Sequence, residues 1–201
     1  MDSQTKLKDH FDKSENEYTP YYCEENIYLL CKKFEEFVKL TEPQNVQAYA
    51  VILTNPTKTI FHQYQRQGHK KHNYLVIWDY HVIFIIKKET ITLVYDFDTI
   101  LDYPCSFNEY FEKSVNFPKP KPTFFRVIKS NDFVEWFASD RSHMIDGETK
   151  KFLQPPPKYE PIVNRLGEKN NLSLFLDLGF KSEGFGVVLK EEQFLELFTN
   201  C

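Results

Sequence analysis

The sequence has no apolar stretch close to the roughly 20 residues that a membrane-spanning helix requires. Its first residues, Met1 to Lys6, contain none of the apolar core that a secretion signal needs. We therefore expect a chain that is neither membrane-bound nor secreted. Basic residues are not in excess either, since the net charge at pH 7 is -4 and the basic clusters at 70–71 and 119–121 are short. Nucleic acid binding needs a basic face, so we expect no nucleic acid partner.

Cysteine pairs and metal-ligand clusters are also missing. The four cysteines stand at positions 23, 31, 105 and 201, without CxxC spacing and without the density of a disulfide scaffold. Free thiols indicate a cytosolic protein, and a chain of 201 residues could also enter the nucleus. His69 and His72 form an HxxH pair that no cysteine or carboxylate cluster accompanies. We interpret the pair as part of a solvated loop and expect neither a metal nor a cofactor.

Aromatic residues are abundant, with 19 Phe and 12 Tyr in a chain that is 41% hydrophobic. Rings bury a large area per residue, so the core should be rich in them. The length is typical of one domain, which we place at residues 18–201. Residues 1–17 are polar and charged, and we expect them to be a flexible N-terminal segment.

Apolar periodicity predicts a helix that starts at Cys23 and closes before Pro43. Its buried stripe consists of Ile27, Leu30, Cys31, Phe34, Phe37 and Val38. Strands are predicted at 48–53, 74–86, 91–97, 123–128 and 184–189, and helical segments at 107–115, 132–138, 172–178 and 191–198. Residues 139–161 form a long ordered loop or a lid. A first helix followed by a mostly antiparallel sheet predicts an α+β fold.

The position of Cys23 indicates reactivity. A thiol at a helix N-terminus lies at the positive end of the helix dipole, which lowers its pKa and favours the thiolate. Cys31 belongs to the apolar stripe, and Cys105 lacks a helix start, so both are interpreted as packing residues. A nucleophilic thiol needs a base, and His81 lies within the strongest predicted strand.

The hairpin formed by strands 74–86 and 91–97 supplies a third group. A symmetric four-residue loop would pair Ile86 with Ile91 and therefore His81 with Asp96. Side chains at directly facing positions lie about 4.5–5.5 Å apart at Cβ, whereas Asp98 would be a diagonal neighbour. Cys23, His81 and Asp96 thus form a candidate nucleophile, base and orienting carboxylate. His143 is the competing base.

Several blocks resemble the protein N-terminal glutamine amidohydrolase family, from about Tyr21 to the C-terminal helix. They are Tyr22-Cys23-Glu24-Glu25-Asn26-Ile27, Val76-Ile77-Trp78-Asp79-Tyr80-His81-Val82, Tyr95-Asp96-Phe97-Asp98-Thr99, the block from Phe137 to Met144, and Pro155-Pro156-Pro157. The resemblance implies a papain- or transglutaminase-like fold with a Cys23–His81–Asp96 triad. It also implies a monomeric cytosolic and nuclear enzyme of the N-degron pathway, which converts N-terminal glutamine to glutamate without a cofactor.

Recognition of a free α-amine in a pocket calls for a carboxylate. Asp79 is two residues from His81 and should share its strand face, so we predict it as the amine partner, with Glu24 and Asp140 as alternatives. Trp78 should point to the other face unless the strand bulges, so we interpret it as a packing residue that reaches the pocket rim at most, and it is the last substrate-binding candidate. Two other functions stay open on this sequence. One is a thiol peptidase or transglutaminase with the same triad, and the other is a non-enzymatic module that binds protein N-termini.

Overall fold

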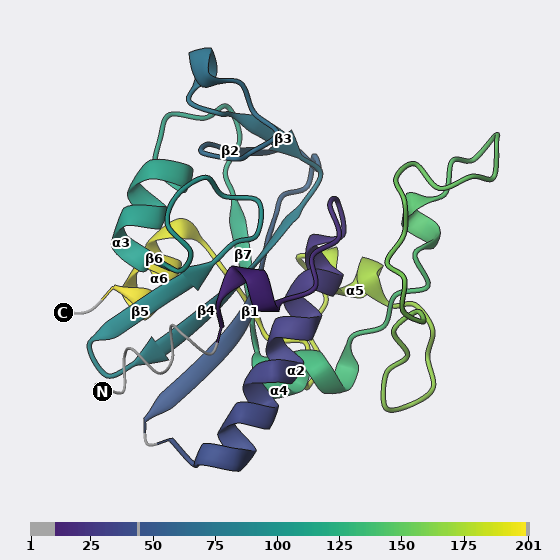
Figure 1. The fold of residues 1–201 in the computed structure, drawn as a ribbon. Coiled ribbons are helices and arrows are strands. Elements are labelled where there is room, and N and C mark those ends of the chain that lie inside the picture. Colours follow the sequence, from purple (N-terminus) through teal and green to yellow (C-terminus); the bar gives the residue numbers. More distant parts are fainter. Residues whose placement is uncertain (1–10, 44, 200–201) are drawn as a thin grey trace.

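Six strands form one antiparallel sheet in the order β6-β5-β4-β1-β7-β8 (Figure 1). The structure is a computed structural model that describes residues 11–43 and 45–199. The strands of this sheet are β1 (Val46–Thr54), β4 (His81–Lys88), β5 (Ile91–Tyr95), β6 (Cys105–Ser106), β7 (Phe124–Lys129) and β8 (Val187–Leu189). A separate two-stranded ladder pairs β2 (Ile60–His62) with β3 (Val76–Trp78). The antiparallel sheet and the first helix confirm the predicted α+β class.

Helices cover both faces of the sheet (Figure 1). One face carries α2 (Cys23–Thr41), α4 (Ser130–Trp136) and α5 (Leu172–Leu176). The other carries α3 (Phe107–Tyr110), its π-helical continuation η3 (Phe111–Val115), and α6 (Glu191–Phe198). Single 3-10 turns occur at η1 (Lys13–Glu15), η2 (Lys70–His72) and η4 (Ser142–Met144).

The alternation of β4 explains this three-layer arrangement. Val82, Phe84 and Ile86 join the core under α2, whereas Ile83 and Ile85 join the core under α3 and α6. Because both faces are covered, the strand reads in the sequence as one continuous apolar run. The predicted stripe of α2 is confirmed, and it packs into the first of these two cores. No helix in the described ranges is long and apolar enough to span a membrane.

Part of the segment expected to be flexible belongs to the core. Residues 1–10 lie outside the described residues, but Phe11 is fully buried. Its ring contacts the rings of Phe34 and Phe37 on α2 and of Phe84 and Tyr95 on the sheet. One aromatic residue among polar neighbours fills a gap between helix and sheet, which the polar composition of 1–17 did not indicate.

The β4–β5 hairpin differs from the predicted register by two residues. Lys88 pairs with Ile91, and Phe84 with Tyr95, so the turn holds two residues instead of four. Glu89, the first turn residue, adopts a left-handed φ of 51°, as tight hairpin turns require. A shift of two residues leaves every side chain on its original face, whereas a shift of one would have reversed them.

The predicted strand 74–86 is interrupted. It divides into β3 and β4, with Asp79 and Tyr80 between them in no strand. The first half pairs with β2 and the second half with β1 and β5. Face alternation therefore does not continue from Trp78 to His81.

The segment 139–161 projects from the body of the molecule and is anchored at its base (Figure 1). Arg141, itself buried, donates from Nε and from one terminal nitrogen to the buried carboxylate of Glu25, at 3.0 and 2.9 Å. Tyr22 Oη also donates to the Gln154 carbonyl at 3.1 Å. The first turn of α2 is thus tied to this loop on two sides.

Candidate active site

Cys23 is the first residue of α2, and the turn before it is held by one asparagine. The Asn26 side chain accepts from the Thr19 backbone N–H and donates to the Thr19 carbonyl, both at 2.8 Å. Tyr21, inside that turn, has a left-handed φ of 70°, which is uncommon for a residue with a side chain. The chain therefore enters the helix at a fixed angle that sets the direction of the Cys23 thiol.

The thiol environment differs from the one predicted. Burial raises the pKa of Cys23 well above its usual value, and the neighbouring Glu24 carboxylate and then Asp98 raise it further. A hydrogen bond from the Val82 backbone N–H acts in the opposite direction. The thiol itself donates to Glu24 Oε2 at 3.6 Å. Because these effects together favour the protonated thiol, Cys23 needs a base to become a thiolate.

His81 and Asp96 form a buried hydrogen-bonded pair. His81 Nε2 lies 3.0 Å from Asp96 Oδ1, and each side chain is 1% exposed. Burial alone lowers the pKa of His81, but the charge and hydrogen bond of Asp96, with the charge of Asp98, raise the pKa overall. Burial raises the pKa of Asp96, yet His81 outweighs it and the pKa lies well below its usual range. His81 is therefore a strengthened base beside a permanently ionised carboxylate.

This contact does not arise from the predicted pairing. The observed register makes Asp98, not Asp96, the residue that would face His81 if the ladder continued, but the ladder ends at Tyr95. Asp96 opens a turn in which its Oδ1 accepts the Asp98 backbone N–H at 2.9 Å. Asp98 accepts from Tyr18 Oη at 2.6 Å and from Gln67 Nε2 at 2.9 Å instead.

Four donors surround the Asp96 carboxylate. Oδ1 receives His81 Nε2 and the Asp98 N–H, while Oδ2 receives Gln65 Nε2 at 2.9 Å and Tyr110 Oη at 2.7 Å. A carboxylate offers about four lone-pair directions, so all of them are used. This fixes the plane of the carboxylate and, through it, the imidazole ring of His81.

Trp78 lies against His81 instead of pointing away from it, and our prediction for its direction was wrong. The two rings are stacked, with centroids 5.6 Å apart and planes at 12°. Trp78 Nε1 also donates to Gln65 Oε1 at 3.2 Å. The break between β3 and β4 allows this orientation, and Trp78 thereby holds both His81 and the amide that supports Asp96.

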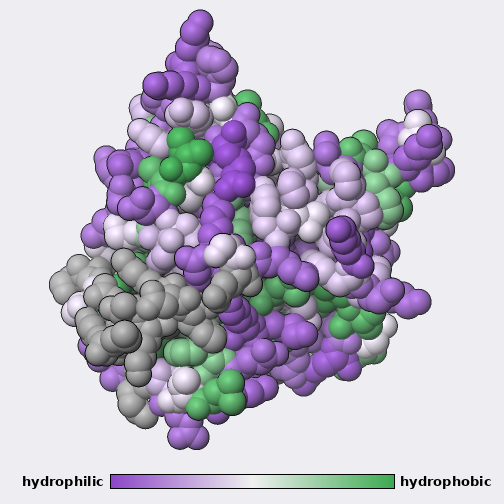
Figure 2. Space-filling model, in the orientation of Figure 1, coloured by the Kyte–Doolittle hydropathy of each residue, from purple (hydrophilic) through white to green (hydrophobic). Residues whose placement is uncertain are grey.

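Cys23 and His81 share one pocket of about 170 Å³. Its lining residues are Tyr21, Cys23, Trp78, Asp79, Tyr80, His81, Asp98, His143, Met144 and Leu153. The molecular surface is notched between the β2–β3 ladder and the projecting segment 139–161 (Figure 2). The pocket is small enough to hold one amino acid side chain, with the thiol and the imidazole on its wall.

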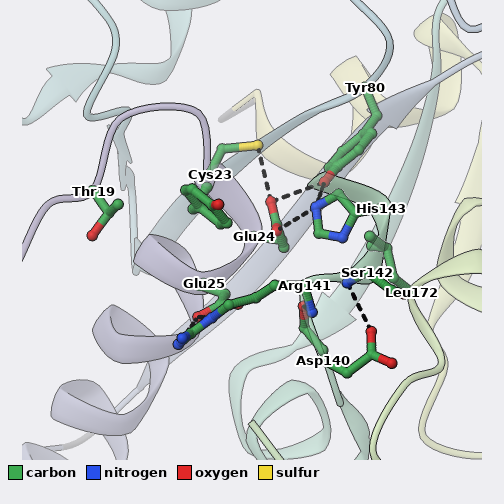
Figure 3. A network of polar contacts seen from close by, with 12 residues as sticks. Thr19, Cys23, Glu24, Glu25, Tyr80, Asp140, Arg141, Ser142, His143 and Leu172 are labelled. Atoms are coloured by element: carbon green, nitrogen blue, oxygen red, sulfur yellow. Dashed lines mark hydrogen bonds and ion pairs between the residues drawn. The ribbon is translucent and has the colours of Figure 1, made fainter. Parts of the chain in front are cut away.

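A second carboxylate–histidine pair, Glu24 and His143, lies beside the thiol (Figure 3). Glu24 is fully buried, and its Oε2 accepts from Tyr80 Oη at 2.9 Å. Its Oε1 lies 3.2 Å from His143 Nε2, whose side chain is 24% exposed. Burial lowers the pKa of His143, but the hydrogen bond and charge of Glu24, with Asp79, raise it overall. The competing base thus lies in the same pocket, with its own carboxylate.

The other predicted amine partners are placed differently. Asp79 is exposed on the pocket lining, and its Oδ1 accepts the Tyr80 backbone N–H at 3.0 Å. Asp140 is absent from that lining; its Oδ1 accepts from the Ser142 N–H at 2.9 Å and from Asn170 Nδ2 at 2.6 Å (Figure 3). Asp79 therefore faces the pocket, whereas Asp140 stabilises the loop that contains His143.

The possible metal ligands in the described ranges are His81, Asp96 and Asp98, whose ligand atoms lie within 4.8 Å of one another. A cation there would need lone pairs that already accept hydrogen bonds. Asp96 has four donors, and Asp98 Oδ1 has two. The donor set therefore fits an ion-paired imidazole better than a metal ion.

Sequence reasoning missed the residues that support this pair. Gln65 and His62 come from the region of β2, and Tyr110 comes from α3. Gln65 and Tyr110 contact Asp96, and His62 contacts Tyr110, across elements far apart in the sequence, so no local pattern signals these contacts. Gln65 is an isolated glutamine in a polar loop, which gives no signal in the sequence. Tyr110, a hydroxyl-bearing residue within an apolar helical stripe, gave a weak signal.

The fold and the site together define an α+β protein with a thiol and an imidazole in one pocket and a buried carboxylate bound to the imidazole, the components of a thiol-dependent acyl-transfer site. The family model for N-terminal glutamine amidase matches residues 18–198. The chain belongs to this family.

Relatives in several organisms are similar over nearly the whole chain. The protein N-terminal glutamine amidohydrolase of Oryza sativa subsp. indica is 36% identical, over 94% of this chain and 89% of the relative. The protein of that name from Homo sapiens is 36% identical, over 92% of this chain and 89% of the relative. That from Bos taurus is 35% identical, over 91% and 87%.

Proposed function

We propose that the protein hydrolyses the side-chain carboxamide of an N-terminal glutamine in proteins and peptides, giving glutamate and ammonia. The observation that carries the proposal is the pocket lined by both Cys23 and His81, with the buried Asp96 bound to His81 behind it. Membership of the N-terminal glutamine amidase family supports the choice of substrate. In our proposal Cys23, His81 and Asp96 are the nucleophile, the base and the orienting carboxylate.

Acylation begins with proton transfer from the thiol. Asp96 occupies Nε2 of His81, which leaves Nδ1 as the ring nitrogen that receives the Cys23 proton. The sulfur attacks the carboxamide carbon, and the carbonyl oxygen becomes an oxyanion. Collapse of this intermediate forms the thioester, and the imidazolium gives its proton to the departing nitrogen, which leaves as ammonia.

Deacylation repeats these steps with water. His81 takes a proton from the water molecule, which attacks the thioester carbon, and the proton then returns to the sulfur as the bond breaks. The backbone N–H of Cys23 belongs to the first helical turn, where N–H groups have no intrahelical acceptor, and it is our proposed oxyanion donor in both halves. No step requires a metal or a cofactor.

The free α-amine is proposed to bind Asp79. Its carboxylate is exposed on the pocket lining beside Tyr80, whereas Glu24 is fully buried and already contacts Tyr80, His143 and the thiol. Glu24 thus stays the alternative partner of the α-amine. Asp140→Asn is the control variant, because Asp140 does not line the pocket. We expect Asp79→Asn to raise KM for a Gln-peptide by about 10- to 100-fold, because one charged hydrogen bond is lost. The N-acetylated peptide should be a poor substrate of both wild type and Asp79→Asn. Equal discrimination in Asp79→Asn and wild type would assign the amine to Glu24.

The decisive experiment is mass spectrometry of Gln-peptides after incubation, together with an ammonia assay. Conversion of the amide to the acid with the backbone intact supports the proposal. Backbone cleavage indicates a thiol peptidase, amide exchange with an added amine indicates a transglutaminase, and tight binding without turnover indicates a non-enzymatic module. An Asn-peptide is the matched control, because its carboxamide is one methylene short and a misplacement of about 1 Å can cost on the order of 10²-fold in rate.

The remaining features of this function are proposals of the same kind. The helix-borne thiol packed against an antiparallel sheet favours a papain- or transglutaminase-like fold for the whole domain, residues 18–201. We further infer a monomer that acts in the cytosol and nucleus on the N-termini of other proteins, as a step of the N-degron pathway. Gel filtration and fractionation of cells test these two points.

A further inference from the structure

A buried chain of hydrogen bonds starts at Asp96 Oδ2, the carboxylate oxygen that does not bind His81. Tyr110 Oη lies 2.7 Å from Asp96 Oδ2, and His62 Nε2 lies 2.9 Å from the same Tyr110 oxygen. His62 is fully buried and Tyr110 is 2% exposed. Neither residue lines the pocket, so neither touches the substrate.

The protons of this chain can be assigned from Asp96. An ionised carboxylate only accepts, so the single hydroxyl proton of Tyr110 points to Asp96 Oδ2. The Tyr110 oxygen must then accept, and its donor is His62 Nε2–H. His62 Nδ1 is left without a proton, and it is in fact buried without a hydrogen-bond partner among the described residues. A proton on Nδ1 would be a buried donor with no acceptor, which is costly.

His62 is therefore a neutral imidazole in one tautomer. Burial lowers the pKa of His62 to about 3, and the charge of His81, whose ring centroid is 5.3 Å away, acts in the same direction. Such a group cannot serve as an acid or base at neutral pH. Its Nε2–H nevertheless occupies the acceptor position of the Tyr110 oxygen and so holds the hydroxyl proton in line with Asp96 Oδ2.

We propose that His62, acting through Tyr110, is a positioning residue that directs the Tyr110 proton to Asp96 Oδ2 and so keeps Asp96 Oδ1 for His81. The inference rests on the proposed role of His81 as the base. A donor at Oδ2 also draws negative charge away from Oδ1. Removing the Tyr110 donor concentrates negative charge on Oδ1 beside His81, which makes the imidazole ring more basic. The limb of the pH–rate profile that reports His81 therefore moves to higher pH.

The other titratable groups around the His81–Asp96 pair come from several elements and remain in place in each variant. Cys23 on α2 shares the pocket with His81, and Asp98 after β5 acts on His81. The groups that act on Asp96 are Lys13 on η1, Tyr18 before α2 and Tyr103 before β6, and Lys119 after η3 acts on His62.

The variants are chosen to separate positioning from packing. Tyr110→Phe removes the hydroxyl, His62→Leu removes the N–H at similar volume, and His62→Gln restores an amide N–H. The matched control is Tyr95→Phe, because Tyr95 is adjacent to Asp96 in sequence and its buried hydroxyl has no hydrogen-bond partner in the described residues. We expect Tyr110→Phe and His62→Leu to lower kcat for a Gln-peptide by about 10- to 100-fold with KM nearly unchanged.

Coupling between the two residues is the sharper test. His62→Leu/Tyr110→Phe should be no slower than Tyr110→Phe alone, because the His62 N–H acts through that hydroxyl and Leu keeps a similar volume beside the His81 ring. His62→Gln should recover most of the rate, and Tyr95→Phe should match wild type. Additive losses in the double variant, or a loss in Tyr95→Phe equal to that in Tyr110→Phe, overturn the proposal.

A second readout does not depend on the substrate. The pH dependence of Cys23 alkylation by iodoacetamide, followed by mass spectrometry, reports the thiol and its base alone. Its limb should move to higher pH in Tyr110→Phe and His62→Leu but not in Tyr95→Phe. An unmoved limb in folded Tyr110→Phe refutes the positioning role. Absence of ammonia release by wild type, with this shift intact, instead refutes the proposed function and leaves the positioning role standing.

Discussion

Replacing Asp96 by Asn tests the core of the site, and its effect can be worked out from the four donors around the carboxylate. An amide oxygen accepts about two hydrogen bonds, and its NH₂ group only donates. If the Asn oxygen faces His81, its NH₂ meets the donors Gln65 and Tyr110. If the amide is reversed, NH₂ meets His81 Nε2. The ring must then carry its proton on Nδ1, and it can no longer accept the thiol proton.

Both arrangements leave at least one buried donor unpaired, at a cost of about 1–3 kcal/mol. In a chain of this size that lowers Tm by roughly 2–12 °C. The rate should fall further, because either the charge that strengthens His81 or its tautomer is lost. The equivalent change in a serine triad costs ~10⁴-fold in kcat, or about 5–6 kcal/mol of barrier.

Ammonia release from a Gln-peptide and calorimetry at neutral pH measure the two effects separately. Asp98→Asn is the matched control, since Asp98 is equally buried but hydrogen-bonds Tyr18 and Gln67 in place of His81. We expect a loss of about 10-fold or less from this control. A larger loss in Asp98→Asn than in Asp96→Asn, or wild-type turnover in Asp96→Asn, would refute the assignment of Asp96 as the orienting carboxylate.

Three further outcomes are expected. Cys23→Ser should abolish turnover without lowering Tm, and iodoacetamide should label Cys23 ahead of the buried Cys31; turnover by the Ser variant excludes Cys23 as nucleophile. His81→Asn should cost about 10²- to 10⁴-fold in kcat and His143→Asn less than 10-fold; the reverse order would transfer the role of base to His143 and Glu24. The pKa of Asp96 is lowered in the folded state and that of His81 is raised. The extra Tm of wild type over Asp96→Asn should therefore shrink below about pH 4 and as the pH rises past about 6.5; a difference constant from acid to alkaline pH would contradict a charged pair.

Much of the fold follows from local patterns. The stripe of α2 has the period of a half-buried helix, and the bounds of this helix were predicted within a few residues. The apolar run of β4 was recognised as a strand, but the predicted strand 74–86 merged it with β3 and ended two residues early. The β2–β3 ladder was missed because three-residue strands carry little periodicity. Phe11 was missed because a single ring gives no period at all.

For the site, the sequence predicted which side of the hairpin a side chain faces, but not its contacts. Asp96 contacts His81 although the pairing was misjudged. An error of two residues keeps the predicted face, and the contact itself is made from the turn that follows β5. The same alternation misplaced Trp78, since it assumed an unbroken strand through Asp79 and Tyr80. The pKa of Cys23 was predicted from the helix dipole alone, whereas burial and Glu24 act more strongly in the opposite direction. The direction of Trp78 and the pKa of Cys23 both depend on tertiary neighbours that lie far away in the sequence.

The stacking of Trp78 on His81 gives the molecule an optical reporter. The two rings lie nearly parallel at 5.6 Å, and a protonated imidazole quenches indole fluorescence by accepting an electron from the excited ring. The chain has two tryptophans. The other, Trp136, is the last residue of α4 and lies against Arg165 and Phe185. In a Trp136→Phe chain, emission should therefore fall while His81 carries the thiol proton and recover when it is passed on. Stopped-flow fluorescence would follow the proton through each turnover of an unlabelled peptide.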